Sequence, residues 1–425
     1  MTEQLDDFFS TARVTTGADA PTFGTESYRD HLYELDDPVL AQWRGLGYEE
    51  FSARKREPGF VQELLASWRA LYDAPFVGIT TDGAVRDVHR LEPVADVDPA
   101  PSAAARRFLG LLDDGQRDAV SHAVDAREWR AWSNPEFVIH RTGLRLEELP
   151  AETADAALAM VAASLSPEGY ARVREAMGLN AFLGDLVGLP DLMNERSYWV
   201  ALFGEPSPDG AWGWQLFGHH VAVSFVSVAG RHVVAPVFLG AEPAESDGAR
   251  PPLFAVRRRL ALELAASWTA DQRAEAVVYA SVLDPAMPEG RLHPADERHV
   301  AGAFRDNRVV PYEGLRADAL TDDQWGTLRA IVEDAFLLLA APQRALTMAD
   351  VDAHRAETFV SWYGATDGTQ PFYLRVHSPV VLTELDHHAG VWLSNQRPAR
   401  FHVHTTLRIP HGNDYGRAYV TQHAG

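Results

Sequence analysis

The pattern of apolar and polar positions predicts several amphipathic helices, most of them marked by a helix-start motif. At residues 113–116, 269–272 and 321–324, Asp or Thr stands three positions before Gln, which is the spacing of a capping box. Because the spacing between these motifs is irregular, we interpret them as ordinary helix starts and not as an internal repeat. The predicted helices lie near residues 60–71, 104–125, 151–163, 166–177, 257–281 and 321–340.

Aromatic and β-branched residues, separated by Gly, Pro and Asp, predict two groups of strands. The strands are expected at residues 198–203, 212–228 and 233–239, and then at 372–376, 380–385 and 401–409. Strands and helices come in runs and do not alternate, which disfavours a doubly wound fold. We therefore predict an α+β fold with a mainly antiparallel sheet and flanking helices.

The chain divides into an N-terminal extension and a larger core. Residues 1–95 are expected to form the extension, with a helix and a hairpin that turns at Asp82-Gly83. The segment near residue 95 is rich in Pro and Ala and shows no periodic apolar face, so we interpret it as a linker. The core, residues 96–425, is expected to contain a helical region over 104–190 and a sheet-containing region over 197–425.

Composition narrows the possible functions. The 425 residues include 60 acidic and 38 basic side chains, giving a net charge of −22, which argues against a nucleic-acid partner. No apolar run reaches the about 18–20 residues of a membrane helix, so we expect a cytoplasmic protein with no membrane partner. Neither glycine-rich phosphate-binding motif is present, so no nucleotide cofactor is expected. A small-molecule substrate is the expected partner, and the sequence leaves the oligomeric state open.

Histidine is the informative residue, because the chain has 17 histidines and no cysteine. Any metal ion must therefore be held by histidine and carboxylate groups. In the strand predicted at 401–409, His402, His404, Thr406 and Arg408 share one face. The two histidines would be about 7 Å apart along the backbone, close enough to bind one ion. The alternative is a pair of polar residues at the rim of the sheet.

Two further segments carry candidate ligands. His219 and His220 are adjacent, so in a strand their side chains face opposite ways and only one should join a given site. A histidine among apolar residues is costly unless it is hydrogen-bonded or ligated. Glu384 and Asp386 would share a face at the end of another strand, where they could complete a histidine set or act as a base. The alternative is a charged strand end.

These segments also resemble a known family, the domain of unknown function 3500. The resemblance covers about residues 100–425, and the block from Trp212-Gly-Trp214 to His219-His220 is its most specific part. This chain has Ile409 where the family usually has aspartate, and Phe401 where asparagine is more common. The resemblance implies no reaction, but it implies that the paired histidines, Glu384 and Asp386 are recurring features. The other matching segments are 164–170, 202–207, 238–243, 373–379, 402–404, 414–416 and 422–423.

Together these features predict a metal-dependent enzyme, favouring an oxygen-dependent oxidoreductase with iron or copper. A zinc-dependent hydrolase and a non-enzymatic acidic binding or scaffold protein are the alternatives. The expected ligands are His220, His402, His404 and Glu384, with Glu242 as an alternative carboxylate. We expect His219, Asp386 and Arg408 to lie next to these ligands and to take part in catalysis. The expected substrate-binding residues are Trp212, Trp214, Phe217, Glu242, Arg375 and Trp392, although each aromatic ring could simply belong to the core.

Overall fold

The helix-start motifs of the sequence begin helices in the computed structural model, which describes residues 27–425 except 93, 96 and 249. Asp113, Thr269 and Thr321 each accept a hydrogen bond from the backbone of the third helical residue, and a Gln side chain bonds back. The α-helices are α2 (Pro38–Ala41), α3 (Tyr48–Lys55), α4 (Gly59–Asp73), α5 (Ala100–Gly110), α6 (Asp114–Val120), α7 (Ala151–Ser164), α8 (Pro167–Val187), α9 (Ala255–Ser267), α10 (Ala270–Ala276), α11 (Asp322–Ala335), α12 (Ala341–Ala353) and α13 (Arg417–Ala424).

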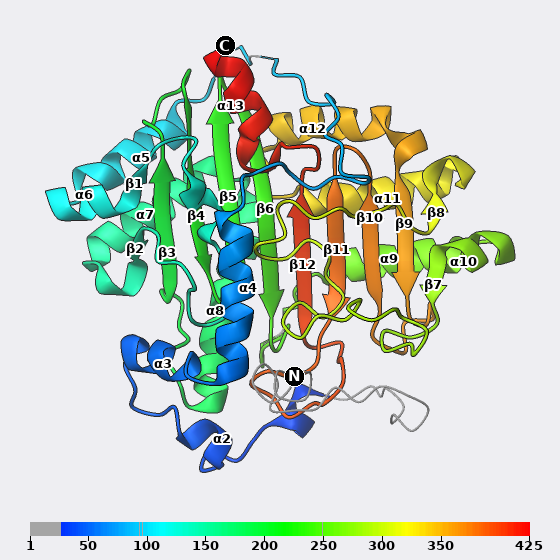
Figure 1. The fold of residues 1–425 in the computed structure, drawn as a ribbon, viewed down its shortest axis with the longest axis horizontal. Coiled ribbons are helices and arrows are strands. Elements are labelled where there is room, and N and C mark those ends of the chain that lie inside the picture. The colour runs from blue at the N-terminus through cyan, green and yellow to red at the C-terminus, as the bar shows by residue number, and fades with distance from the viewer. Residues whose placement is uncertain (1–26, 93, 96, 249) are drawn as a thin grey trace.

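A sheet of twelve strands runs through the described part of the molecule (Figure 1). Its order is β1-β3-β4-β5-β6-β12-β11-β10-β9-β7, with β2 paired to β3 and β8 paired to β9. Most pairs are antiparallel, so the fold is α+β as predicted. The strands are β1 (Ser121–His122), β2 (Leu144–Arg145), β3 (Tyr198–Phe203), β4 (Ala211–Gly218), β5 (Val221–Val228), β6 (Arg231–Ala241), β7 (Val277–Tyr279), β8 (Leu315–Arg316), β9 (Phe359–Tyr363), β10 (Tyr373–His377), β11 (Leu382–His387) and β12 (Val403–Arg408).

The sheet is built from two halves with the same order of elements. In the first half, two helices, two short strands and two longer helices (α5 to α8) precede the meander β3–β6. In the second half, α9 to α12 and the short strands β7 and β8 precede the meander β9–β12 in the same way. Strand β1 is parallel to β3 and β7 is parallel to β9, and the halves join where β6 pairs with β12. The capping boxes are helix starts as predicted, and those at Asp113 and Thr269 begin helices that hold equivalent places in the two halves, α6 and α10.

Several predicted boundaries differ from the structure. The strand predicted over 212–228 is two strands, because the chain turns at His219-His220, where neither residue is a usual turn residue. The helices predicted over 104–125 and 257–281 are each two helices. The helix predicted over 166–177 continues to Val187 and ends at Gly188, whose φ of 70° suits glycine.

The N-terminal segment packs on the same core as the rest of the chain. Phe51, Leu65 and Trp68, from α3 and α4, belong to the main hydrophobic cluster together with residues of the sheet. The predicted helix is present as α4, which lies in front of the sheet and runs along its strands in Figure 1. The predicted hairpin is not formed, because Thr80 makes only one isolated bridge, to Val309. Residues 1–26 of the predicted extension lie outside the described residues.

Among the described residues, no helix is long and apolar enough to cross a membrane.

Candidate metal centre

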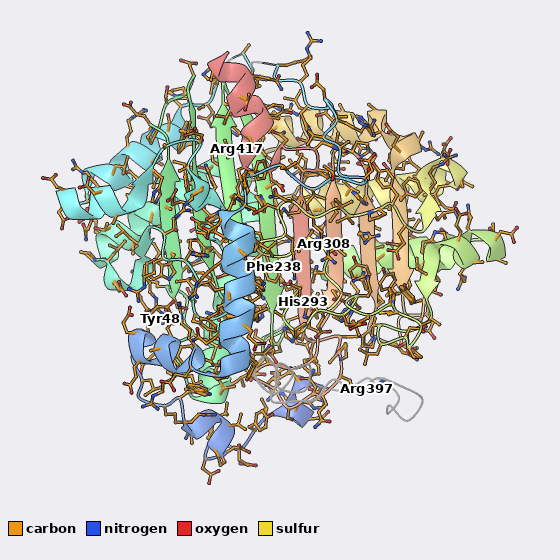
Figure 2. The ribbon with its side chains drawn as sticks, in the orientation of Figure 1. Tyr48, Phe238, His293, Arg308, Arg397 and Arg417 are labelled. Carbon is orange, nitrogen blue, oxygen red and sulfur yellow. The ribbon has the colours of Figure 1, made fainter. Side chains whose placement is uncertain are left out.

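One face of the sheet carries a concentration of buried polar side chains. Pairing across the strands places Phe238, Thr406 and Glu384 in one row, continued by Arg375. The next row contains His404 and its neighbours Gly240, Asp386 and Tyr373. The chain between β7 and β8 passes over this face in Figure 1, and Figure 2 shows Phe238 near its centre. This covering segment, residues 280–314, is called the β7–β8 loop below.

Three of the predicted ligands meet on this face. His220, His402 and His404 each offer a ring nitrogen, and these nitrogens lie within 4.8 Å of one another. The Nε2 atoms of His402 and His404 are 3.0 Å apart. The Nδ1 of His402 lies 2.7 Å from the carbonyl oxygen of Ala389, which can only accept a hydrogen bond. The proton of His402 therefore sits on Nδ1, and its Nε2 keeps a lone pair for a cation.

The position of His220 depends on an unusual backbone conformation. His220 is in the turn between β4 and β5 and has a φ of 63°, which is rare for a residue with a side chain. Its ring stacks on that of His219 with 3.9 Å between centroids, and its buried Nδ1 has no hydrogen-bond partner. Because such strain persists only where the surroundings enforce it, His220 is a candidate functional residue.

Gly240 provides the space in which two of these rings meet. It pairs with His404 across the sheet. A Cβ atom at Gly240 would lie 2.5 Å from Cδ2 of His404 and 3.3 Å from Cδ2 of His220. Any side chain at this position would therefore displace a candidate ligand.

A second group of histidines adjoins the first. His299 and His388 form it together with His404, again with ligand nitrogens within 4.8 Å of one another. The rings of His388 and His404 are 3.9 Å apart, and those of His299 and His388 are 5.4 Å apart. We call the five residues His220, His299, His388, His402 and His404 the histidine cluster. All five are buried.

Glu384 holds the β7–β8 loop against the sheet and is not part of either histidine group. It accepts hydrogen bonds from the backbone N–H groups of Val300 and Ala301 at 2.7 and 3.1 Å. The hydroxyls of Tyr373 and Thr406 each donate to it at 2.7 Å. These bonds place the loop residue His299, whose Nδ1 lies 3.2 Å from the Glu384 carboxylate. Glu384 is therefore positioned to orient a histidine.

Other carboxylates also contact the histidine cluster from outside. Asp386 pairs with Arg298 at 2.7 Å, and its other oxygen lies 3.2 Å from Nε2 of His388. Glu242 accepts hydrogen bonds from the backbone N–H groups of residues 391–393 and lies 3.9 Å from Nδ1 of His402. Carboxylates that orient imidazoles are typical of the surroundings of a metal site.

The pKa values favour neutral imidazoles at most positions. Burial and the neighbouring histidines hold the pKa of His220, His388 and His404 well below its usual range. Burial also lowers the pKa of His402 to about 3. Burial opposes the charged form of His299, but the Glu384 carboxylate outweighs it and raises the pKa of this histidine. A neutral imidazole is the form that binds a metal ion.

The two predicted acid ligands differ in charge. Burial would raise the pKa of Glu384, but His299 and the hydrogen bonds that it accepts lower its pKa to about 2. Burial raises the pKa of Glu242 to about 7, despite three backbone N–H donors. Near neutral pH, Glu384 is therefore more fully ionised than Glu242.

Several predicted residues lie away from the histidine cluster. Arg408 is buried between Asp306 and Asp414, and its guanidinium forms ion pairs with both carboxylates. Trp212 and Trp214 pack on Phe225, and the indole of Trp214 donates to Ser164 of α7, on the other face of the sheet. Arg375 pairs with Glu313 at 2.5 Å.

The remaining predicted residues are closer to the histidine cluster. Phe217 lies in the same cross-strand row as Phe238 through Ala222. Trp392 stacks on Phe51, and its backbone N–H donates to Glu242. His219 hydrogen-bonds Asn180 at 2.8 Å through Nδ1, and burial lowers the pKa of His219 to about 4.

Sequence reasoning missed His299 and His388. His299 is in the β7–β8 loop, where no strand alternation applies, and it reaches the sheet only through the bonds of Glu384. His388 follows Glu384 and Asp386 in the sequence, and the adjacent pair His387-His388 was the available signal.

Comparison with known families matches residues 97–417, which include the whole histidine cluster, to the family described as Protein of unknown function (DUF3500). Comparisons with curated proteins and with solved structures gave no match. Helices α2 to α4 precede the matched region. The match covers well over half of the sequence, and the chain therefore belongs to the DUF3500 family.

Proposed function

We propose that this protein is a metal-dependent enzyme, an oxidoreductase that acts on a small organic molecule with oxygen. The observation that carries the proposal is the convergence of His220, His402 and His404, with ligand nitrogens within 4.8 Å and no carboxylate in the set. Two Nε2 atoms 3.0 Å apart in a buried site are a ready pair of donors for one cation.

The ligand type narrows the choice of metal. Imidazole binds copper, zinc, iron and nickel, whereas magnesium and calcium prefer oxygen ligands. An all-histidine set without a carboxylate favours copper over the iron of two-histidine, one-carboxylate sites. Bound copper would supply one-electron chemistry with oxygen, whereas zinc would activate a water molecule. The aromatic ring of Phe238, 4.9 Å from that of His404, gives the site an apolar side.

The residues of the chain would prepare the site for the ion. The Ala389 carbonyl fixes the tautomer of His402, and Gly240 leaves room for the rings of His404 and His220. The β7–β8 loop, bound to Glu384, covers the same face and excludes water from it. A dry, pre-formed set of neutral ligands needs little rearrangement when the ion binds.

Metal analysis of the isolated protein tests the proposal. We expect at least one copper or iron ion per chain. We also expect a visible or paramagnetic signal that changes when oxygen is admitted. The variant that combines His402→Ala and His404→Ala should lose the metal, whereas His232→Asn, at a buried histidine elsewhere in β6, should keep it.

Other results would favour the alternatives. Zinc alone, with no spectral response to oxygen, would favour a zinc-dependent hydrolase, which the same ligands also suit. Unchanged metal content in the double variant, with only stability lowered, would contradict the proposed site and favour a scaffold protein. A cytoplasmic location is part of the proposal, and cell fractionation tests it.

A further inference from the structure

The histidine cluster contains more ligands than one ion needs. An ion bound by His220, His402 and His404 would leave His299 and His388 unused. These two lie with His404 in a second set that satisfies the same distance limit. His404 is the residue common to both sets.

One of the unused histidines has a buried nitrogen without a partner. The Nε2 of His299 is buried and makes no hydrogen bond, whereas its Nδ1 and the Nε2 of His388 each lie 3.2 Å from a carboxylate oxygen. Such groups are rare in proteins, because leaving a buried polar atom unsatisfied is costly. His220 in the first set shows the same feature at Nδ1. Each set thus contains one buried nitrogen without a polar partner, Nδ1 of His220 in the first and Nε2 of His299 in the second.

Carboxylates also surround the histidine cluster. Four carboxylates contact residues of the histidine cluster or the chain next to it. Among the described residues, Arg298 forms ion pairs with two of these carboxylates, Glu297 and Asp386. The four are Glu242, Glu297, Glu384 and Asp386. Glu297 and Asp386 lie 3.5 and 3.2 Å from the nitrogens of His388, and Glu384 lies 3.2 Å from His299. Three of the four carboxylates therefore lie next to the second set of histidines.

We propose that the histidine cluster binds two metal ions, the second held by His299, His388 and the shared His404. The inference rests on the proposed function, because it assumes that the first set binds an ion. His404 can serve both ions, one through each ring nitrogen, once its N–H proton is released to solvent. Glu384 and Asp386 act as positioning residues that orient His299 and His388. Two neighbouring ions can hold two atoms of one substrate or of oxygen.

Counting ions in the full-length wild-type protein tests the inference. The metal-free protein is titrated with cobalt(II), and bound cobalt is measured by its visible absorption and by elemental analysis after desalting. We expect two equivalents per chain. The variants His299→Asn and His388→Asn should each bind one equivalent, and His220→Asn should also bind one, at the other position.

Matched variants separate loss of a ligand from loss of folding. His232→Asn changes a buried histidine outside the histidine cluster and should still bind two equivalents. Any variant whose circular dichroism differs from wild type is replaced by the glutamine variant at the same position, His299→Gln or His388→Gln, which removes the ligand but keeps a polar side chain of similar length. X-ray diffraction at the cobalt edge should show two anomalous peaks in the wild type.

Three outcomes are decisive. Two equivalents that fall to one in the His299 and His388 variants support the second site. One equivalent that is lost in His220→Asn but unchanged in His299→Asn overturns the second site and leaves the proposed function intact. No bound metal in the wild type overturns both.

Discussion

Replacing Glu384 with Gln tests whether this carboxylate organises the β7–β8 loop. In the wild type its Oε1 accepts from Val300 N–H and Tyr373 Oη, and its Oε2 accepts from Ala301 N–H and Thr406 Oγ1. Glutamine keeps the shape and one oxygen, but its NH₂ group replaces the other oxygen. The Thr406 hydroxyl can rotate to accept a bond, whereas the Ala301 N–H can only donate and is left facing a donor.

The magnitude follows from these contacts. An unsatisfied buried donor costs about 1–3 kcal/mol. Glu384→Gln also removes the charge from one side of the buried pair Glu384–His299. Breaking such pairs costs about 3–5 kcal/mol in other proteins. We therefore expect Glu384→Gln to lower the free energy of unfolding by about 3–5 kcal/mol. Thr406→Val is the matched control, because it removes one neutral donor and should cost about 1 kcal/mol.

Urea unfolding, followed by tryptophan fluorescence, measures both changes. The shift in midpoint is converted to free energy only if the slope of the transition stays the same as in wild type. A loss under about 1 kcal/mol for Glu384→Gln, or an equal loss for Thr406→Val, would show that the carboxylate charge does not organise the loop and would refute the reasoning.

Three more predictions concern other parts of the chain. Gly240→Ala should reduce metal content about tenfold or more, because its Cβ would enter the space of two candidate ligand rings and approach the Val403 carbonyl oxygen; full metal occupancy would contradict this. Gly326→Ala, in α11 with open space around its Cβ, should raise the free energy of unfolding by about 0.5–1 kcal/mol in urea unfolding. Burial lowers the pKa of His232 to about 4 and that of His377 to about 3, so the unfolded chain binds more protons than the native one below pH 6.5. Stability should therefore fall between pH 7 and pH 5, by about 2 kcal/mol for each of these histidines, and His377→Asn should remove its share; a pH-independent midpoint would contradict the assignment.

Strand periodicity predicted part of the site correctly. The alternation around residue 403 placed His402 and His404 on one face, and the structure brings their Nε2 atoms to 3.0 Å. The capping boxes predicted the starts of α6, α10 and α11. Both signals are local, because they depend on backbone geometry within a few residues.

The features that sequence reasoning missed depend on distant contacts. The turn at His219-His220 lacks glycine and asparagine, so its positive φ could not be expected from residue type. His299 joins the histidine cluster only because Glu384, far away in the sequence, binds the backbone next to it. The two matching halves are hidden because their loops differ, and only the order of strands shows them.

The place of β12 in the sheet has a consequence for synthesis of the protein. This strand follows the other eleven strands in the sequence, yet it lies between β6 and β11 in the middle of the sheet. Until it emerges, β6 has an unpaired edge that can associate with other nascent chains. His402 and His404 arrive with the same strand, so the first candidate metal site is incomplete until the two halves have joined. Metal loading would then report that all twelve strands of the sheet have been made and that its two halves have joined.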